Sequence, residues 1–322
     1  MRIPAIVCGV ILLVAPILVA SAQNYPNRPI RIVVPTGPGS STFNIAHMIG
    51  ERLSERLGQP VVVESRPGAS QMIGADHVAK STADGYTIML TSASFTGSVT
   101  VRAKLPFDPV NDLTGITMVA QGPLVLVVHP SLPVKTVKEL IALARARPGQ
   151  INYGSAGTGS VVHLMAEVFA ASAKINIVHV PYKVFAQAVT DTVGGHVEML
   201  FSSMPSVWPQ VKANRVRALA VTSAKRSALV PELPTVAEAG VPGYEAGQWW
   251  GTFAPGKTPK DIVAKLYDEI QKILVAEEVK SRFVAQGAEP VLGMTPDAFS
   301  ATVKNEIAKW SKVVKERNIK PQ

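Results

Sequence analysis

Two short loops combine glycines with hydroxyl side chains in an order that suits the binding of a small anion. Each loop follows a short apolar run and precedes a helical pattern, so each places backbone N–H groups at the start of a helix. These N–H groups have no partner inside the helix, and the helix dipole adds partial positive charge there. The candidate ligand-binding residues are Thr36, Gly37, Gly39, Ser40, Ser41 and Thr42 in the first loop, and Ser155, Ala156, Gly157, Thr158, Gly159 and Ser160 in the second.

Four more candidates stand where other predicted strands end, namely Ser92, Ser94, Tyr182 and Ser202. In sheets built from βαβ units, ligands bind beyond the carboxyl ends of the strands, which is where all four should lie. The hydroxyl of Tyr182 is expected to reach toward the ligand. Two such loops, far apart in the sequence, suggest two lobes that close on one anion from both sides.

The same loops leave other interpretations open. The second loop has the G-x-x-x-x-G spacing of a phosphate-binding loop, but Ser160 stands where such a loop needs lysine. Gly37 and Gly39 match a dinucleotide fingerprint only loosely. The serines and threonines of both loops also suit helix capping alone, with no ligand.

Catalytic and metal chemistry have less support. A serine hydrolase needs a base and an orienting acid beside its nucleophile, and no G-x-S-x-G elbow occurs in the sequence. The six histidines fall in helices, at strand ends and in a turn, without an evident acid partner, and no metal-site spacing is seen. We therefore expect no catalytic residue, metal or cofactor, and keep an exported serine hydrolase as the rival hypothesis.

The amino terminus has the pattern of a secretory signal peptide. Arg2 precedes an apolar run at residues 6–19, which ends in an Ala-Ser-Ala site before Gln23. The run is short for a transmembrane helix. Cleavage would remove Cys8, the one cysteine, so we expect neither disulfides nor thiolate chemistry in the mature protein.

Length and charge agree with an exported binding protein. The 322 residues suit one large domain or two lobes, and a hydrophobic share of 47% can bury a substantial core. A net charge of +9 suits an anionic ligand. Basic residues do not interleave with aromatic ones, so nucleic acid is not an expected partner.

Strands alternate with helices along the chain, which predicts an α/β fold of mixed, mainly parallel sheets flanked by helices. Apolar runs on either side of Gly122 and Pro123 suggest a crossing into a second lobe, and residues 243–253 suggest the return. In that return, Trp249 and Trp250 either fill the hinge or the core, or stack on a ligand. The expected organisation is a signal peptide at 1–22, a discontinuous lobe 1 at 23–123 and 249–322, and lobe 2 at 124–248.

Many motifs occur in a characteristic order along the chain. They are YPNRPIRIVVP at 25–35, LGQPVVVE at 57–64, RPGA at 66–69, DGYT at 84–87, LPFDP at 105–109, YGSAGTGS at 153–160, HVPYK at 179–183, RALAVTSAKR at 217–226, PTVAEAG at 234–240 and AQGAEP at 285–290. This set closely resembles the Bug family, the periplasmic solute receptors of tripartite tricarboxylate transporters. The resemblance implies a type II periplasmic binding protein fold with two lobes. It also implies that the loops at 36–42 and 155–160 hold a ligand carboxylate, partly through ordered waters.

The sequence departs from the family pattern near the expected ligand. The family usually has an acid at the position of Phe43 and another at the position of Ser202, and Val184 and Gln187 replace a usual glycine and proline. A site without those carboxylates lacks partners for a ligand ammonium group. We therefore predict that a plain or aromatic carboxylate, or a neutral amide, binds better than an amino acid.

These observations together predict a non-enzymatic receptor that captures a small anionic or aromatic carboxylate in the periplasm. The resemblance implies inner-membrane transporter subunits as partners. A receptor that acts in signalling, without a transporter, is the alternative within the same class. We expect the receptor to act as a monomer.

Overall fold

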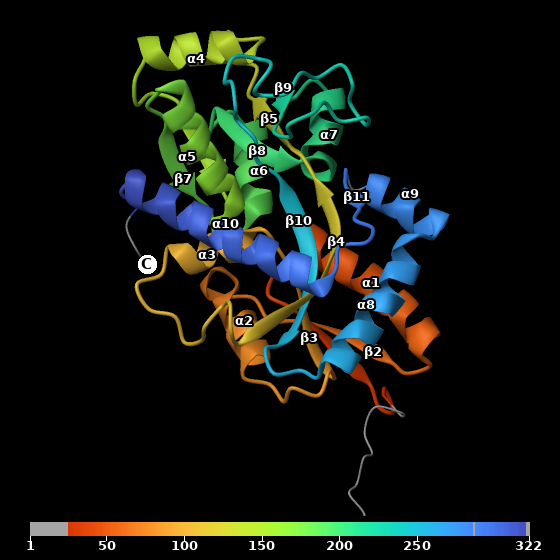
Figure 1. The fold of residues 1–322 in the computed structure, drawn as a ribbon. Coiled ribbons are helices and arrows are strands. Elements are labelled where there is room, and N and C mark those ends of the chain that lie inside the picture. Colours follow the sequence, from red (N-terminus) through yellow and green to blue (C-terminus); the bar gives the residue numbers. More distant parts are fainter. Residues whose placement is uncertain (1–24, 286, 320–322) are drawn as a thin grey trace, which may run out of the picture.

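The computed structural model describes residues 25–285 and 287–319. Within these residues the chain builds two mixed β-sheets flanked by helices, and long strands run between them (Figure 1). We call the part around the six-stranded sheet lobe 1 and the part around the five-stranded sheet lobe 2. The predicted signal peptide at 1–22, with Cys8, lies outside the described residues. In the described ranges, no helix is both long enough and apolar enough to cross a membrane.

The sheet of lobe 1 has the strand order β11-β4-β10-β3-β1-β2. β1 lies parallel to both β2 and β3, and the other pairings are antiparallel. The strands are β1 (Ile30–Val34), β2 (Val61–Ser65), β3 (Thr87–Ser92), β4 (Leu113–Gly122), β10 (Gln248–Pro255) and β11 (Glu289–Pro290). The helices are α1 (Ser41–Leu57), the short turn η2 (Ala69–Gln71), α2 (Met72–Ala79), α3 (Ser94–Thr100), α8 (Lys260–Leu274), α9 (Glu277–Ala285) and α10 (Pro296–Glu316).

The sheet of lobe 2 has the order β7-β6-β8-β5-β9. β6 lies parallel to β7 and β8, whereas β5 is antiparallel to β8 and β9. The strands are β5 (Leu124–Val128), β6 (Asn152–Ser155), β7 (Val178–Pro181), β8 (Met199–Ser203) and β9 (Arg217–Val221). The helices are α4 (Val137–Ala146), α5 (Val161–Ala173), α6 (Phe185–Val193) and α7 (Met204–Lys212).

Helix α1 shows how local sequence signals set the element boundaries. The hydroxyl of Ser40 accepts the N–H of Phe43 at 3.2 Å and caps the first turn. Ile45, Ile49 and Leu53 bury one face of the helix at the expected spacing of four residues. Gly58 then adopts a left-handed conformation with φ of 64° and ends the helix, as its position after Leu57 predicts.

The sheets are mixed, as expected, but parallel pairing is less extensive than expected. Two of the five pairings in lobe 1 and two of the four in lobe 2 are parallel among the described residues. Each antiparallel pairing includes β4, β5 or β10. β4 and β5 carry the chain into lobe 2, and β10 brings it back, so these strands run against their neighbours.

Two elements lie outside the sequence expectation, and one expected element is missing. Helix α3 follows β3 directly although its sequence, SFTGSVT, contains poor helix formers. Tertiary packing compensates, since Phe95 is fully buried. The two-residue strand β11 is too short to predict. Residues 231–239, which the sequence predicts to be a loop followed by a short helix, form turns and an isolated bridge at Thr235 instead.

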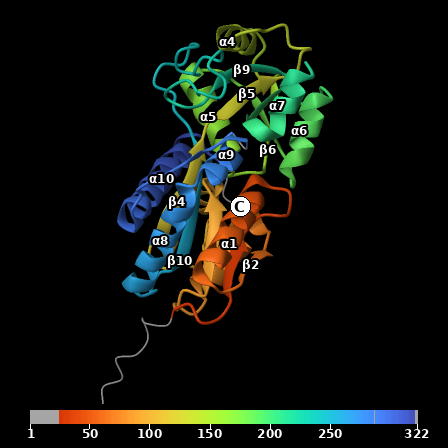
Figure 2. The ribbon, with the colours of Figure 1, turned by 90° about the vertical axis from the view of Figure 1, so that its right-hand side faces the viewer.

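The crossing between the lobes is filled by aromatic side chains. The chain passes from β4 into β5 through Gly122 and Pro123, and β10 returns beside β4 (Figures 1 and 2). Trp249 and Trp250 are only 4% and 1% exposed. They lie in two different clusters of the hydrophobic core, and the cluster with Trp249 continues from lobe 1 into lobe 2. Both tryptophans therefore fill the crossing, as the first of the two interpretations expected.

Helix α10 extends across both lobes in front of this crossing (Figure 1). At its beginning, Phe299 packs against Trp249 with ring centroids 5.4 Å apart. Just beyond its end, Arg317 Nε donates to Glu167 of α5 at 2.9 Å. The final helix thus contacts the core of lobe 1 and the helix that follows the second loop.

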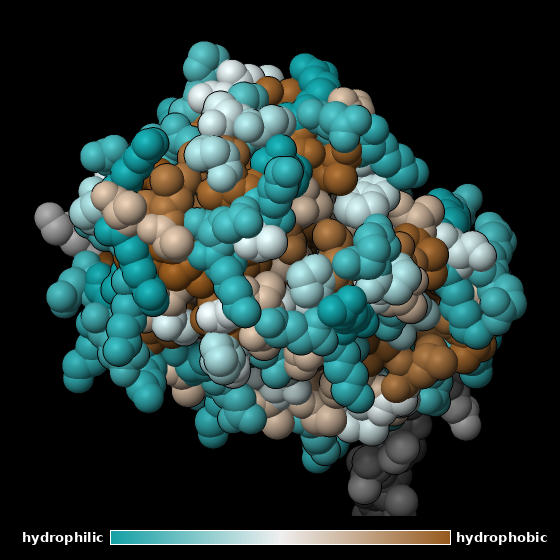
Figure 3. Space-filling view, turned by 90° about the horizontal axis from the view of Figure 1, so that it is seen from above, coloured by the Kyte–Doolittle hydropathy of each residue, from teal (hydrophilic) through white to brown (hydrophobic). Residues whose placement is uncertain are grey.

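Most of the basic residues lie on the surface rather than in one cluster. Lys135, Lys138, Arg145 and Arg147, on and beside α4, are all exposed. The face seen from the α4 end is mostly hydrophilic, with hydrophobic residues showing in separate patches (Figure 3). Most of the positively charged side chains are therefore solvated at the surface.

Candidate functional site

The first loop leaves the carboxyl end of β1 and is held by its own hydroxyls. Ser40 Oγ donates to Gly37 O at 2.9 Å and lies 2.8 Å from Thr36 Oγ1. Ser65 Oγ, at the end of β2, donates to Thr36 O at 2.9 Å and ties the loop to the sheet. In this loop the hydroxyls of Thr36 and Ser40 fix the backbone, so they serve first as caps and braces.

The backbone of the first loop is open to a ligand. A side chain added at Gly37 or Gly39 would meet no atom within 4 Å, so space lies in front of both residues. The N–H groups of Gly37, Gly39, Ser41 and Thr42 have no hydrogen-bond partner among the described residues. Donors grouped in this way at a helix start suit a carboxylate.

The second loop has the same design. Ser160 caps α5: its hydroxyl accepts the N–H of His163 at 3.4 Å and donates to Gly157 O at 2.7 Å. Ser155 Oγ accepts the N–H of Gly157 at 3.0 Å. Gly157 and Gly159 have φ of 98° and 80°, a backbone region that favours glycine. Within the described part of the chain, the N–H groups of Ala156 and Thr158 remain without a partner.

The second loop, at residues 155–160 in lobe 2, contacts helix α3 of lobe 1. Ser94 Oγ accepts the N–H of Val161 at 3.3 Å. A methyl group on Gly97 would lie 2.4 Å from Gly159 O, so the two backbones are in close contact. α3 follows β3, which is paired in parallel with β1, so the first loop and α3 leave the same edge of the lobe 1 sheet. The structure therefore brings the second loop to the edge from which the first loop departs.

The remaining candidates differ in what their side chains do. Ser92 is the last residue of β3 and is 3% exposed. Tyr182 follows β7, but its hydroxyl donates to Asp191 of α6 at 2.7 Å instead of reaching out for a ligand, because its ring folds back beside Gly154. Burial and this bond raise the pKa of Tyr182 to about 12. Ser202 lies within β8 and is fully buried, and its hydroxyl has no partner in the described ranges.

Sequence reasoning missed two histidines that support the second loop. His179 Nε2 lies 2.6 Å from Ser155 Oγ, and His163 Nδ1 accepts the N–H of Gly159 at 3.1 Å. Burial lowers the pKa of His163 to about 4. Burial, and to a lesser extent the neighbouring His163, lower the pKa of His179 to about 3. The only sequence signal was that His179 falls near the end of a predicted strand, whereas β7 extends to Pro181.

The Ser155 and His179 pair does not form a catalytic triad. An imidazole with a pKa near 3 is a weak base at neutral pH, and a serine nucleophile needs a stronger one. No carboxylate among the described residues is hydrogen-bonded to the ring of His179 to orient it. The described residues also contain no group of three or more potential metal ligands.

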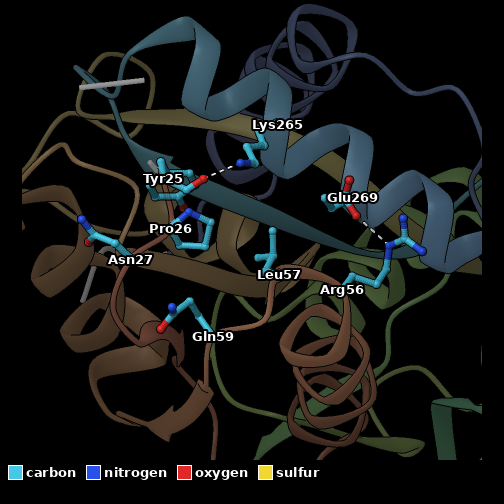
Figure 4. Close-up of a pocket in the computed structure, with 8 residues that line it drawn as sticks. All are labelled: Tyr25, Pro26, Asn27, Arg56, Leu57, Gln59, Lys265 and Glu269. Atoms are coloured by element: carbon cyan, nitrogen blue, oxygen red, sulfur yellow. Dashed lines mark hydrogen bonds and ion pairs between the residues drawn. The ribbon is translucent and has the colours of Figure 1, made fainter. Parts of the chain in front are cut away.

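A pocket of about 440 Å³ lies elsewhere, on the outside of lobe 1 (Figure 4). It is lined by the first described residues, the end of α1 and one face of α8. Lys265 donates to the carbonyl of Tyr25, and Arg56 pairs with Glu269 at 2.7 Å across its wall. None of the predicted ligand-binding residues lines this pocket.

Comparisons with known proteins agree with this architecture. The model of the tripartite tricarboxylate transporter family receptor matches residues 45–319. The chain is 39% identical over 302 residues to protein BugT of Bordetella pertussis, covering 93% of this chain and 92% of BugT. The structure of R. palustris Rpa4515 with adipate has a TM-score of 0.85 at 38% identity, covering 92% of this chain and 100% of that one. MatC from Rhodopseudomonas palustris with bound malate has a TM-score of 0.82 at 29% identity, covering 90% of this chain and 100% of that one.

The family model spans most of the described chain, and the structural likeness covers both lobes. Members of this family are substrate-binding receptors and not enzymes, which removes the hydrolase hypothesis. The resemblance drawn from the sequence motifs is thereby confirmed: the chain belongs to the family of tripartite tricarboxylate transporter receptors.

Proposed function

We propose that this receptor captures a small carboxylate between the loop at residues 36–42 and the loop at residues 155–160. The observation that carries the proposal is the matched design of the two helix starts. Each has a serine N-cap and N–H groups without a partner in the described chain. Each also has glycines that face free space or adopt a left-handed backbone conformation. Such N–H groups, with the helix dipole, stabilise a negative charge. The adipate and malate bound to the two R. palustris relatives are carboxylates of this kind.

The ligand class follows from what surrounds these donors. Phe43, in the first turn of α1, stacks edge-on against His47, with ring centroids 4.5 Å apart, and offers no charge. Ser202, the other position where the family usually has an acid, is neutral and lies within β8. Neither residue can balance a ligand ammonium group, which would lose hydration without gaining a partner. The preferred ligand is therefore a plain or aromatic carboxylate, or a neutral amide.

The setting of this receptor is the periplasm. Cleavage before Gln23 would release a mature protein with lobe 1 at 23–123 and 249–322 and lobe 2 at 124–248. Closure about the crossing at Gly122 and Pro123 would exclude water from the bound ligand. The closed form would then deliver the ligand, as a monomer, to inner-membrane transporter subunits.

A thermal-shift screen of the purified mature protein tests the ligand class, because a ligand that binds only the folded state raises its melting temperature. The screen compares succinate with aspartate and glutarate with glutamate, since each pair differs by the ammonium group alone. Adipate, malate, benzoate and nicotinamide complete the panel. We expect stabilisation by carboxylates and a smaller shift with each amino acid. Sub-micromolar binding of aspartate or glutamate would contradict the proposal.

A further inference from the structure

Two histidines lie stacked directly beneath the second loop. The rings of His163, on α5, and His179, on β7, have centroids 4.0 Å apart and planes inclined by 23°. Tyr153, on β6, stacks on His179 at 5.0 Å. His163 is only 4% exposed and Tyr153 is fully buried. The three rings come from three elements, so this stack exists only when lobe 2 is folded.

Each imidazole is bonded to a different end of the loop. His179 Nε2 contacts the hydroxyl of Ser155, where the loop leaves β6, at 2.6 Å. His163 Nδ1 accepts the N–H of Gly159, just before the cap of α5, at 3.1 Å. Ser155 in turn accepts the N–H of Gly157 in the middle of the loop. The path of the backbone between these points depends on both rings.

We propose that His163 and His179 are positioning residues, which brace the second loop from below and keep the N–H groups of Ala156 and Thr158 directed at the ligand anion. This inference rests on the function proposed above. In it, the two histidines fix the geometry of the anion-binding loop at residues 155–160.

The hydrogen bond from Gly159 defines the tautomer of His163. His163 accepts at Nδ1, so its proton is on Nε2. Ser155 Oγ accepts the N–H of Gly157 at 3.0 Å, donates to Gly157 O at 3.2 Å and lies 2.6 Å from His179 Nε2. Either neutral tautomer of His179 can form this last hydrogen bond, as donor or as acceptor. Both rings are neutral in this arrangement, and burial favours the neutral forms.

The charged groups near the stack do not alter this assignment. Glu167 of α5 accepts from the hydroxyl of Tyr153 at 2.8 Å and from Arg317, beyond α10, at 2.9 Å. Its two oxygens are thus bonded to other groups, and neither imidazole is paired with a carboxylate of any residue that the structure describes. The receptor therefore holds the anion with backbone N–H groups and not with a histidine cation.

The role of the two histidines can be tested in the free protein, without any ligand. Nitrogen–proton correlation spectra of protein labelled at the histidine nitrogens report the tautomer and charge of each ring. We expect His163 to carry its proton on Nε2, with both rings neutral down to about pH 5. A proton on Nδ1 of His163, or titration of either ring near its ordinary pKa of about 6.5, would overturn the proposal.

Matched substitutions test the effect on binding, with adipate as the probe in calorimetric titration. His163→Asn keeps an acceptor for Gly159, and His179→Gln keeps a polar partner for Ser155, whereas His163→Phe and His179→Phe keep only the stacked ring. Each Phe variant should weaken adipate binding about tenfold, the value of one hydrogen bond, and each amide variant by no more than about threefold. His196→Gln, at an exposed turn, should bind as wild type does.

The outcomes separate this proposal from the proposed function. Wild-type affinity in both Phe variants, or equal losses in the Phe and amide variants, would contradict the proposed role of the two histidines in positioning the loop. If a Phe variant fails to fold, as its thermal melt would show, the amide variants and the spectra still decide. If wild type itself does not bind adipate or any carboxylate of the screen, the proposed function fails. The spectra of the free protein would still test whether the two histidines are bonded to the loop as proposed.

Discussion

The hydroxyl oxygen of Ser94 in lobe 1 accepts the backbone N–H of Val161 in lobe 2 at 3.3 Å. This bond joins the first turn of α3 to the first turn of α5, the helix that starts at the second loop. It satisfies one of the N–H groups that a helix start leaves without an internal partner. The second loop is therefore positioned by lobe 1 as well as by its own lobe, and four predictions follow from this arrangement and its surroundings.

Gly97→Ala should force the second loop away from α3. The added methyl group would lie 2.4 Å from Gly159 O and 2.7 Å from Leu164 Cδ1. Overpacking of this kind lowers the free energy of unfolding by about 1–3 kcal/mol, and it should also weaken adipate binding. Urea unfolding and calorimetric titration measure the two effects. Gly247→Ala is the control, since its methyl group meets nothing within 4 Å, and equal behaviour of the two variants would contradict the close contact.

Ser40→Asp should separate helix capping from ligand binding. Aspartate caps a helix about as well as serine but cannot donate to Gly37 O, so the loss of stability should not exceed that of one hydrogen bond, about 1 kcal/mol. The new carboxylate would lie among the N–H donors of the first loop and repel an anion, so adipate binding should fall by at least about tenfold. Thr136→Asp makes the same change at the N-cap of α4, where Thr136 Oγ1 accepts the N–H of Glu139. Unchanged adipate affinity in Ser40→Asp would argue for pure capping.

Glu306→Gln should stabilise the protein at neutral pH. Glu306 accepts from Trp249 Nε1 at 2.9 Å and lies 3.0 Å from Thr96 Oγ1, but burial outweighs these bonds and raises its pKa. A carboxyl group with a raised pKa contributes most to stability below its ordinary pKa, and the contribution is lost as pH rises through the raised value. Glutamine keeps both contacts without the charge. The melting temperature of the variant should exceed that of wild type at about pH 8 and not at about pH 4.

The exposed Glu245 provides a control for this effect, because glutamine there should leave the dependence on pH unchanged. An equal gain for both substitutions at high pH would mean that net charge, and not burial of Glu306, is responsible.

The two stacked histidines should make the protein sensitive to mild acid. Burial lowers the pKa of His163 to about 4, from about 6.5 when unfolded, so the unfolded chain takes up its proton first as pH falls. The stabilising contribution is complete above about pH 6.5 and is lost toward about pH 4. For His163 alone the loss between about pH 6.5 and pH 5 is about 2 kcal/mol. Urea unfolding should show a smaller loss in the His163→Asn, His179→Gln double variant than in wild type, and equal losses would exclude the histidines as the cause.

Sequence patterns were reliable where a local signal has one structural meaning. Ser40, Thr136 and Ser160 cap helices, and Gly58 ends one, because capping depends on a few neighbouring backbone groups. The order of strands and helices followed from their periodicity. Both loops could be chosen as candidates for the same reason, since glycines and hydroxyls directly before a helix define an anion seat locally.

Patterns failed where the outcome depends on distant partners. Tyr182 stands at the expected strand end, yet Asp191 fixes where its hydroxyl points. Helix α3 forms against its own propensity because Phe95 is buried. Nothing near Ser155 in the sequence indicates His179, because the two meet only through the parallel pairing of β6 and β7.

The amino-acid sequence by itself determined the family, the two-lobed α/β architecture and the two helix starts that suit an anion. These features follow from local periodicity, capping residues and motifs in a characteristic order. Tertiary structure alone decided that Ser94 of lobe 1 meets Val161 of lobe 2 and that two neutral histidines support the second loop. The physical reason is that hydrogen bonds between residues far apart in the chain, and the pKa values that burial produces, depend on which surfaces come together when the lobes pack.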